Sequence, residues 1–233
     1  MKVLLTILAI FCAAPLFARD TSATITLLPK DWDKKSPLPL VIWLHGRGAD
    51  PTLLKEEKWH QEVADKLGLA IVGIAATRRV APDAYEWSGD IEADYAHIRA
   101  KLSEVEMAKR VTFSRKMLFG FSQGAVLSAE IAARHPDQFL GAIVLSPGCQ
   151  FKINELPASA ALAKQSYFIS CGQKEQPGNL WFSRYYAARL HELGAKTVLR
   201  EVEGVSEHHR PVDLRDRFPE WVTAIMGQGA GQP

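Results

Sequence analysis

The chain has 233 residues, of which 47% are hydrophobic and 23% charged, and its formal net charge is +2. This length is enough for one α/β domain with a sizeable hydrophobic core. Because the positive and negative residues are nearly balanced and interspersed, the sequence indicates neither nucleic acid nor an anionic surface as a partner.

The first residues have the pattern of a secretory signal. Lys2 precedes the apolar run 3–11, and small residues follow up to Ala18. We expect residues 1–18 to be a signal peptide and residues 19–233 to form a single domain. The apolar run is short for a membrane span of roughly 20 residues. The sequence therefore predicts a secreted or periplasmic protein, with no membrane insertion once the signal is removed.

Removal of the signal would leave two cysteines, Cys149 and Cys171. Each follows one of two successive predicted strands, and in an oxidising compartment they could pair. A disulfide between neighbouring parallel strands is geometrically awkward, so the pairing stays open.

Apolar runs and helical patterns alternate along the chain. The expected strands are 23–28, 40–44, 69–75, 117–119, 140–145, 167–170 and 197–202, and the expected helices are 56–67, 91–107, 125–134, 180–193 and 215–226. Segment 77–90 is expected to be irregular, and segment 150–164 to cross over the top of the sheet. Continuous apolar runs such as 40–44 are typical of strands buried on both faces of a parallel sheet. The alternation predicts right-handed crossovers and a mostly parallel sheet flanked by helices.

The pentapeptide Gly120-Phe121-Ser122-Gln123-Gly124 lies between a predicted strand and a predicted helix. Gly-x-Ser-x-Gly in this context is typical of a nucleophile elbow, where strand and helix come too close for side chains at the two glycines. The strained turn would raise the Ser122 hydroxyl above the sheet. It would also leave the Gln123 N–H at a helix N-terminus, where it can face a developing oxyanion. We predict Ser122 as the nucleophile and Gln123 as an oxyanion donor.

A nucleophilic serine needs a base, and the base needs an acid that orients it. His208 and His209 lie in the loop after the last predicted strand, where the base of such a site should stand. We predict His208 as the base, with His209 as the alternative. The acid should follow the strand 167–170, which favours Glu175; Glu155, after the preceding strand, is the alternative.

A second oxyanion donor is expected in the loop after an early buried strand. His45-Gly46-Arg47-Gly48 follows the strand 40–44, and its glycines allow the backbone to turn its N–H groups inward. We assign this donor to the Arg47 N–H.

From residue 38 to about residue 221 the sequence resembles the α/β-hydrolase superfamily. It is most similar to the phospholipase/carboxylesterase group, which includes acyl-protein thioesterases and bacterial predicted esterases. The matching stretches are Leu44-His45-Gly46-Arg47-Gly48, Trp87 to Asp90, Gly120 to Ala125, Arg134-His135-Pro136-Asp137 and Leu145-Ser146-Pro147-Gly148. The resemblance implies an α/β-hydrolase fold with a minimal lid, a Ser-Asp-His triad and no cofactor. Here Glu175 stands at the usual aspartate position, and Glu207-His208-His209-Arg210 replaces the usual Gly-His.

These observations lead us to expect that residues 19–233 form a single α/β-hydrolase catalytic domain. The expected activity is that of a serine carboxylesterase that cleaves a small-molecule ester through an acyl-enzyme intermediate. A serine peptidase on the same fold and a catalytically inactive binding protein are the alternatives, because the fold alone does not separate them. We predict no metal site, and the sequence does not indicate an oligomeric state.

Overall fold

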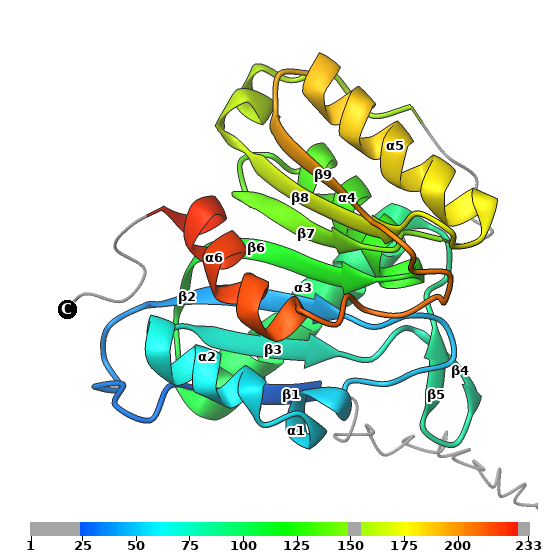
Figure 1. The fold of residues 1–233 in the computed structure, drawn as a ribbon. Helices are drawn as coiled ribbons and strands as arrows, with labels where there is room; N and C mark the ends of the chain where they lie inside the picture. The colour runs from blue at the N-terminus through cyan, green and yellow to red at the C-terminus, as the bar shows by residue number, and fades with distance from the viewer. Residues whose placement is uncertain (1–23, 149–154, 228–233) are drawn as a thin grey trace, which may run out of the picture.

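The structure is a computed structural model that describes residues 24–148 and 155–227. Within these residues, seven strands form a central sheet in the order β1-β3-β2-β6-β7-β8-β9 (Figure 1). Their bounds are β1 Thr24–Leu27, β2 Leu38–Leu44, β3 Ala70–Ile74, β6 Phe113–Phe121, β7 Gly141–Leu145, β8 Ser166–Gly172 and β9 Lys196–Val202. The edge strand β1 is antiparallel to β3, and the other neighbouring pairs are parallel. The mostly parallel sheet is therefore confirmed.

Helices cover both faces of this sheet (Figure 1). Their bounds are α1 Leu53–Glu56, α2 Trp59–Leu67, α3 Ile91–Lys109, α4 Gln123–Arg134, α5 Pro177–Glu192 and α6 Leu214–Met226. Successive side chains of a strand point to opposite faces. In β2, Leu40 and Ile42 accordingly pack in the apolar layer of α3, α4 and α5, whereas Val41 and Trp43 pack in the layer of α2 and α6. Burial on both faces is why the central strands are continuous apolar runs.

Of the helix expected over 56–67, only residues 59–67 form α2, and Glu56 is the last residue of the separate helix α1. Glu57 between them has an extended backbone, with φ −95° and ψ 94°. Its carboxylate accepts a hydrogen bond from the Trp59 indole (2.9 Å) and pairs with the guanidinium of Arg210. These side-chain contacts hold the connecting residue outside helical geometry, which the periodicity of apolar residues does not reveal.

The segment expected to be irregular, 77–90, contains a β-hairpin of β4 Arg78–Ala81 and β5 Ala84–Glu86. Strand β4 is exposed along its whole length, so it lacks the apolar pattern from which a strand is predicted. The hairpin is attached to the loop after β2, because the Gly48 N–H donates to the Tyr85 carbonyl (2.8 Å) and the Tyr85 N–H donates to the Ala49 carbonyl (3.0 Å). The prediction of an irregular segment was wrong, and the hairpin forms one wall of the site described below.

Three expectations fall wholly or partly outside the described residues. The signal peptide 1–18 lies outside them, as does Cys149, whose pairing with the buried Cys171 the sequence left open. The predicted crossing 150–164 is described only from residue 155, and it includes a short 3-10 helix, Ala160–Lys164. Among the described helices, none combines the length and the apolar character that a bilayer crossing requires.

Candidate active site

The strained residue of the elbow is Ser122, between β6 and α4. Its backbone has φ 57° and ψ −119°, an uncommon conformation for a residue other than glycine. The Ser122 N–H donates to the Leu145 carbonyl of β7 at 2.9 Å. A Cβ on Gly120 would lie 2.1 Å from the Gly124 carbonyl oxygen, and one on Gly124 would lie 2.1 Å from the Leu44 carbonyl oxygen. Strand and helix therefore approach as closely as the motif predicts, and both glycines are sterically required.

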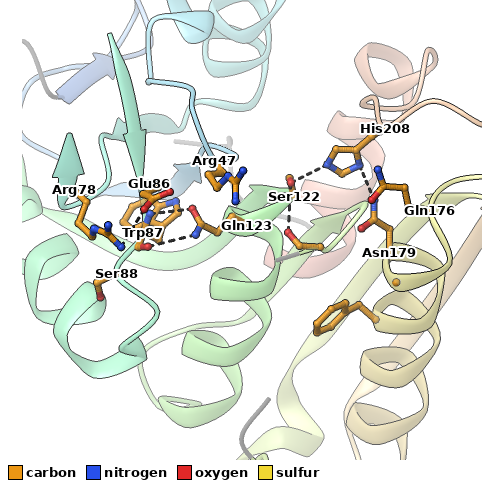
Figure 2. A pocket seen from close by; sticks show the side chains of 13 residues that line it. Arg47, Arg78, Glu86, Trp87, Ser88, Ser122, Gln123, Gln176, Asn179 and His208 are labelled. Carbon is orange, nitrogen blue, oxygen red and sulfur yellow. Dashed lines mark hydrogen bonds and ion pairs between the residues drawn. The ribbon is translucent and has the colours of Figure 1, made fainter. Parts of the chain in front are cut away.

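Three separate segments place their side chains around the Ser122 hydroxyl. Ser122 Oγ lies 2.8 Å from His208 Nε2, and His208 Nδ1 lies 3.0 Å from Glu175 Oε2 (Figure 2 shows the first contact). Glu175 comes from the loop after β8, and His208 from the loop after β9. The His208 ring stacks on Phe121 of β6, with centroids 4.8 Å apart. The structure thus brings together the serine, histidine and acid that the sequence predicts as a triad.

The Glu175 carboxylate is enclosed, with none of its side-chain surface exposed. Its Oε1 accepts hydrogen bonds from the Ser146 hydroxyl (2.7 Å) and the Gly172 N–H (3.0 Å). Its Oε2 faces His208 and accepts a hydrogen bond from the Asn179 amide at 3.0 Å. Burial by itself would raise the pKa of Glu175, but the hydrogen bonds from His208, Gly172, Ser146 and Asn179 prevail and lower it to about 2.

An ionised Glu175 determines the tautomer of His208. The carboxylate oxygen accepts the proton of Nδ1, which leaves Nε2 as an acceptor for the Ser122 hydroxyl. Asn179 Nδ2 also lies 2.9 Å from His208 Nδ1, but that nitrogen carries a proton, so the amide donates to the carboxylate. The arrangement can take a proton from Ser122 and stabilise the imidazolium that results.

His209, the alternative base, and Glu155, the alternative acid, lie away from Ser122. The His209 side chain is 72% exposed and pairs with Glu207 at 3.0 Å. The Glu155 side chain is 85% exposed and pairs with Arg189 at 3.4 Å. Neither takes part in the hydrogen-bond chain that starts at Ser122.

The predicted oxyanion donors are Arg47, in the loop after β2, and Gln123, the first residue of α4. Gly46 approaches so closely that a Cβ on it would lie 3.1 Å from Ser122 Cβ. The Gly48 N–H is already bonded to the Tyr85 carbonyl. Within the described part of the chain, by contrast, the N–H groups of Arg47 and Gln123 donate to no backbone carbonyl. They are therefore available to a bound oxyanion.

A hydrogen-bond network that the sequence analysis missed holds these loops in place. The Trp87 N–H donates to Gln123 Oε1 (2.9 Å), and Gln123 Nε2 donates to the Trp87 carbonyl (3.3 Å; Figure 2). The Trp87 indole donates to the His45 carbonyl at 2.9 Å. His45 Nε2 accepts from the Ala76 N–H at 2.9 Å, and burial lowers the pKa of His45, so this histidine is a neutral structural group. In the sequence analysis the run Trp87 to Asp90 was only a match to the resembled family, and this run is the part of the sequence that could have indicated the network.

Ser146 and Asn179 were also missed by the sequence analysis. Ser146 reaches Glu175 from a backbone with φ 46°, which nothing in its sequence context indicates. Asn179 lies four residues after Glu175. Helix α5 begins at Pro177 rather than at the predicted residue 180, so Asn179 is in its first turn and its side chain faces the Glu175 carboxylate. Proline is well suited to the first helical position, and it was the signal for this earlier start.

A cavity of about 660 Å³ opens over Ser122, between the β4–β5 hairpin and the first turns of α5. Its lining includes Arg47, Arg78, Glu86, Trp87 and Ser88 on the hairpin side, and Gln176, Gly178, Asn179 and Phe182 on the α5 side. Among the residues that the structure describes, no group of three His, Cys, Asp or Glu side chains is placed to hold a metal ion.

Comparisons with known proteins identify a family for this chain. A sequence model of the family described as "Putative esterase" matches residues 18–183, which is more than half of the chain. The protein "Putative esterase NocK" of Nocardia uniformis subsp. tsuyamanensis is 31% identical over 106 residues, or 44% of this chain and 31% of that protein. The chain therefore matches that curated relative over about a third of the relative's length.

Solved structures share the fold at low sequence identity. Esterase PE8 has a TM-score of 0.65 at 19% identity, over 87% of this chain and 98% of its own. The Bacillus cereus carboxylesterase has a TM-score of 0.59 at 17% identity, over 87% of this chain and 93% of its own. Acyl-protein thioesterase 2 of Zea mays has a TM-score of 0.61 at 18% identity, over 88% of this chain and 99% of its own. The chain therefore belongs to this family of esterase-type hydrolases and has the α/β-hydrolase fold of the phospholipase/carboxylesterase group.

Proposed function

We propose that this protein is a serine carboxylesterase that cleaves small-molecule esters through an acyl-enzyme intermediate. The observation that carries the proposal is the 2.8 Å contact between Ser122 Oγ and His208 Nε2, with Glu175 behind the imidazole. This is the geometry that a nucleophilic hydroxyl and its general base require. Membership of the esterase family supports the same reaction class.

In the first half of the reaction, Ser122 Oγ attacks the ester carbonyl carbon while His208 Nε2 takes the hydroxyl proton. The Arg47 and Gln123 N–H groups then donate to the oxyanion, each contributing on the order of 3 kcal/mol to the stability of the transition state. Ionised Glu175 stabilises the imidazolium. When the carbon–oxygen bond breaks, His208 gives its proton to the departing alkoxide, and the alcohol leaves.

In the second half, a water molecule attacks the acyl carbon of the Ser122 ester and His208 takes a proton from it. The same two N–H groups stabilise the second tetrahedral intermediate. Collapse of this intermediate breaks the bond to Ser122 Oγ, which takes the proton back from His208. The products are one carboxylic acid and one alcohol per water consumed, and the enzyme returns to its starting state.

The direct test is the variant Ser122→Ala, assayed with p-nitrophenyl butyrate and with a fluorophosphonate probe. We expect kcat/KM to fall by at least about 10³ and covalent labelling to disappear, because the nucleophile is lost. Ser103→Ala, an exposed serine on α3, is the matched control and should keep both properties. Turnover and labelling retained in a folded Ser122→Ala protein would contradict the proposal.

These assays, with aminoacyl p-nitroanilides added as substrates, distinguish the esterase from a serine peptidase and from a binding protein without catalysis. A serine peptidase would cleave aminoacyl p-nitroanilides with a higher kcat/KM than the ester. A binding protein without catalysis would cleave neither substrate, and the probe would not label it. We expect ester cleavage to dominate, because an ester carbonyl is more reactive than an amide carbonyl and an alcohol leaves more readily than an amine, so that the triad and its two N–H donors suffice.

We further propose that the protein is exported and that residues 1–18 are removed. The positively charged Lys2, the short apolar run 3–11 and the small residues up to Ala18 support this. Expression of the full chain in a Gram-negative bacterium, followed by intact mass measurement of the periplasmic fraction, should give a protein that starts at Arg19. Recovery of the full-length mass from the cytoplasm would contradict export.

A further inference from the structure

The cavity over Ser122 has two halves of unlike chemistry. On the hairpin side, Arg47, Arg78 and Glu86 bring three charged side chains to the wall. On the α5 side, the wall includes the Phe182 ring and the backbone of Gly178. Figure 2 shows Arg47, Arg78 and Glu86 on one side of Ser122 and His208 on the other. A substrate that fills both halves would therefore be polar and charged at one end and more apolar at the other.

The charges of the hairpin half do not cancel. Arg78 Nη1 lies 3.0 Å from Glu86 Oε1, so these two residues form a neutral pair. Arg47 is exposed, and its guanidinium takes part in none of the ion pairs found among the described residues. The hairpin half consequently carries one uncompensated positive charge close to the reacting carbon, because Arg47 follows Gly46, which packs against Ser122.

The position of His208 determines which part of an ester enters which half. The alcohol oxygen must face His208 Nε2, because that nitrogen returns the proton to it. His208 stands on the α5 side, where its Nδ1 lies 2.9 Å from the Asn179 amide. The alcohol is therefore directed towards α5 and Phe182. The hairpin half of the cavity, which includes Arg47, is then left for the acyl group.

We propose that the enzyme prefers esters whose acyl group carries a carboxylate, and that the Arg47 guanidinium binds this carboxylate. The inference rests on the proposed esterase function and assigns the acyl part of its substrate. A guanidinium pairs with a carboxylate through two parallel hydrogen bonds, which gives orientation as well as affinity. Arg78 contributes less, because Glu86 already engages it.

The experiment compares two esters that differ in one charge. The first is the mono-p-nitrophenyl ester of adipic acid, with a free carboxylate, and the second is its methyl ester. For each protein the ratio of kcat/KM for the charged to the neutral ester is measured after subtraction of uncatalysed hydrolysis. Wild type should give a ratio above one that decreases as NaCl is added, since salt screens an exposed charge pair.

Three variants should change this ratio of kcat/KM values in different ways. Arg47→Gln should lower it about tenfold, because the charge-assisted pair is lost while the backbone N–H remains. Glu86→Gln should raise it, because the substitution removes a negative charge and releases Arg78. Arg79→Gln removes the same charge from the same hairpin at a position that does not line the cavity, so the ratio should not change.

Other outcomes would overturn the inference. A ratio of one in wild type, or an unchanged ratio in a folded Arg47→Gln protein, would remove the assigned role of Arg47 while Ser122-dependent cleavage of the methyl ester still supported the proposed function. A second pair, 4-acetoxybenzoate and 4-acetoxybenzamide, places the charge on the alcohol. If Arg47→Gln lowered only that pair's ratio, the acyl assignment would be wrong. If wild type cleaved none of these esters, the proposed function itself would fail.

Discussion

The side-chain amide of Asn179 lies 3.0 Å from Glu175 Oε2, in the first turn of the helix that follows the glutamate. On its other side, the amide oxygen of Asn179 packs against Gly148, where a Cβ would lie only 2.1 Å from it. Because Asn179 is buried between these two neighbours, α5 itself holds one oxygen of the carboxylate. A glutamate has one more rotatable bond than the aspartate usual in the group, so this restraint supplies rigidity that the longer side chain lacks.

Asn179→Ala should therefore reduce kcat more than KM. The remaining donors keep Glu175 ionised, but the carboxylate gains freedom and points less often at His208. We expect kcat to fall about tenfold, which corresponds to roughly 1.4 kcal/mol of lost transition-state stabilisation. Steady-state kinetics with p-nitrophenyl butyrate measures it. A variant that is folded and as active as wild type would show that Asn179 does not position the acid.

Glu175→Gln tests the acid itself. Loss of the carboxylate removes the preference for the Nδ1–H tautomer and the stabilisation of the imidazolium, so we expect kcat/KM to fall on the order of 10²–10³. Glu155→Gln is the matched control, since the Glu155 side chain is 85% exposed and lies outside the hydrogen-bond chain. A large loss of kcat/KM in Glu155→Gln with almost none in Glu175→Gln would mean that the acid of the triad is Glu155, in the segment after β7.

The two adjacent histidines should respond very differently to alanine. His208→Ala removes the group that contacts Ser122 Oγ, and kcat should fall by about 10³ or more. His209→Ala removes an exposed side chain paired with Glu207, and kcat should change less than about twofold. The reverse ranking would keep the mechanism and make His209 the base.

Gly124 is expected to tolerate no side chain. A Cβ there would lie 2.1 Å from the Leu44 carbonyl oxygen, so Gly124→Ala should cost about 3 kcal/mol or more of unfolding free energy. Gly178→Ala provides a matched comparison, because a Cβ at Gly178 meets no atom within 4 Å. Urea unfolding of both variants measures the difference. Equal stability of the two proteins would contradict the close approach at the elbow.

The buried side chain of His60 should make the free energy of unfolding depend on pH. Burial lowers the pKa of His60 from 6.5 to about 4, so between these values the unfolded chain binds a proton that the folded chain excludes. Stability should therefore fall as the pH decreases from about 6.5 towards about 4, by roughly 3 kcal/mol from this group. Urea unfolding at pH 7, 5.5 and 4.5 tests it. In His60→Phe the decrease should be clearly smaller, and an identical decrease would exclude His60 as its source.

The sequence alone determined those features of the protein whose physical cause is local. The elbow around Ser122 follows from the steric requirement for two glycines between a strand and a helix. The parallel sheet follows from apolar runs that alternate with amphipathic helices, because burial on both faces removes the two-residue alternation of a half-exposed strand. The segments that carry Arg47, Glu175 and His208 were predicted from their places after particular strands.

Only the tertiary structure decided which of the candidate histidines and which of the candidate glutamates is placed in the hydrogen-bond chain of Ser122. His208 and His209 are neighbours in sequence, and the stacking of one ring on Phe121 distinguishes them. Glu175 differs from Glu155 because three groups donate hydrogen bonds to its carboxylate: the Ser146 hydroxyl after β7, the Gly172 N–H at the end of β8 and the Asn179 amide in α5. The β4–β5 hairpin was invisible to the sequence because its first strand is exposed throughout and its attachment uses backbone groups. Contacts between distant backbone and side-chain atoms leave no periodic pattern in a chain, so folding alone brings them together.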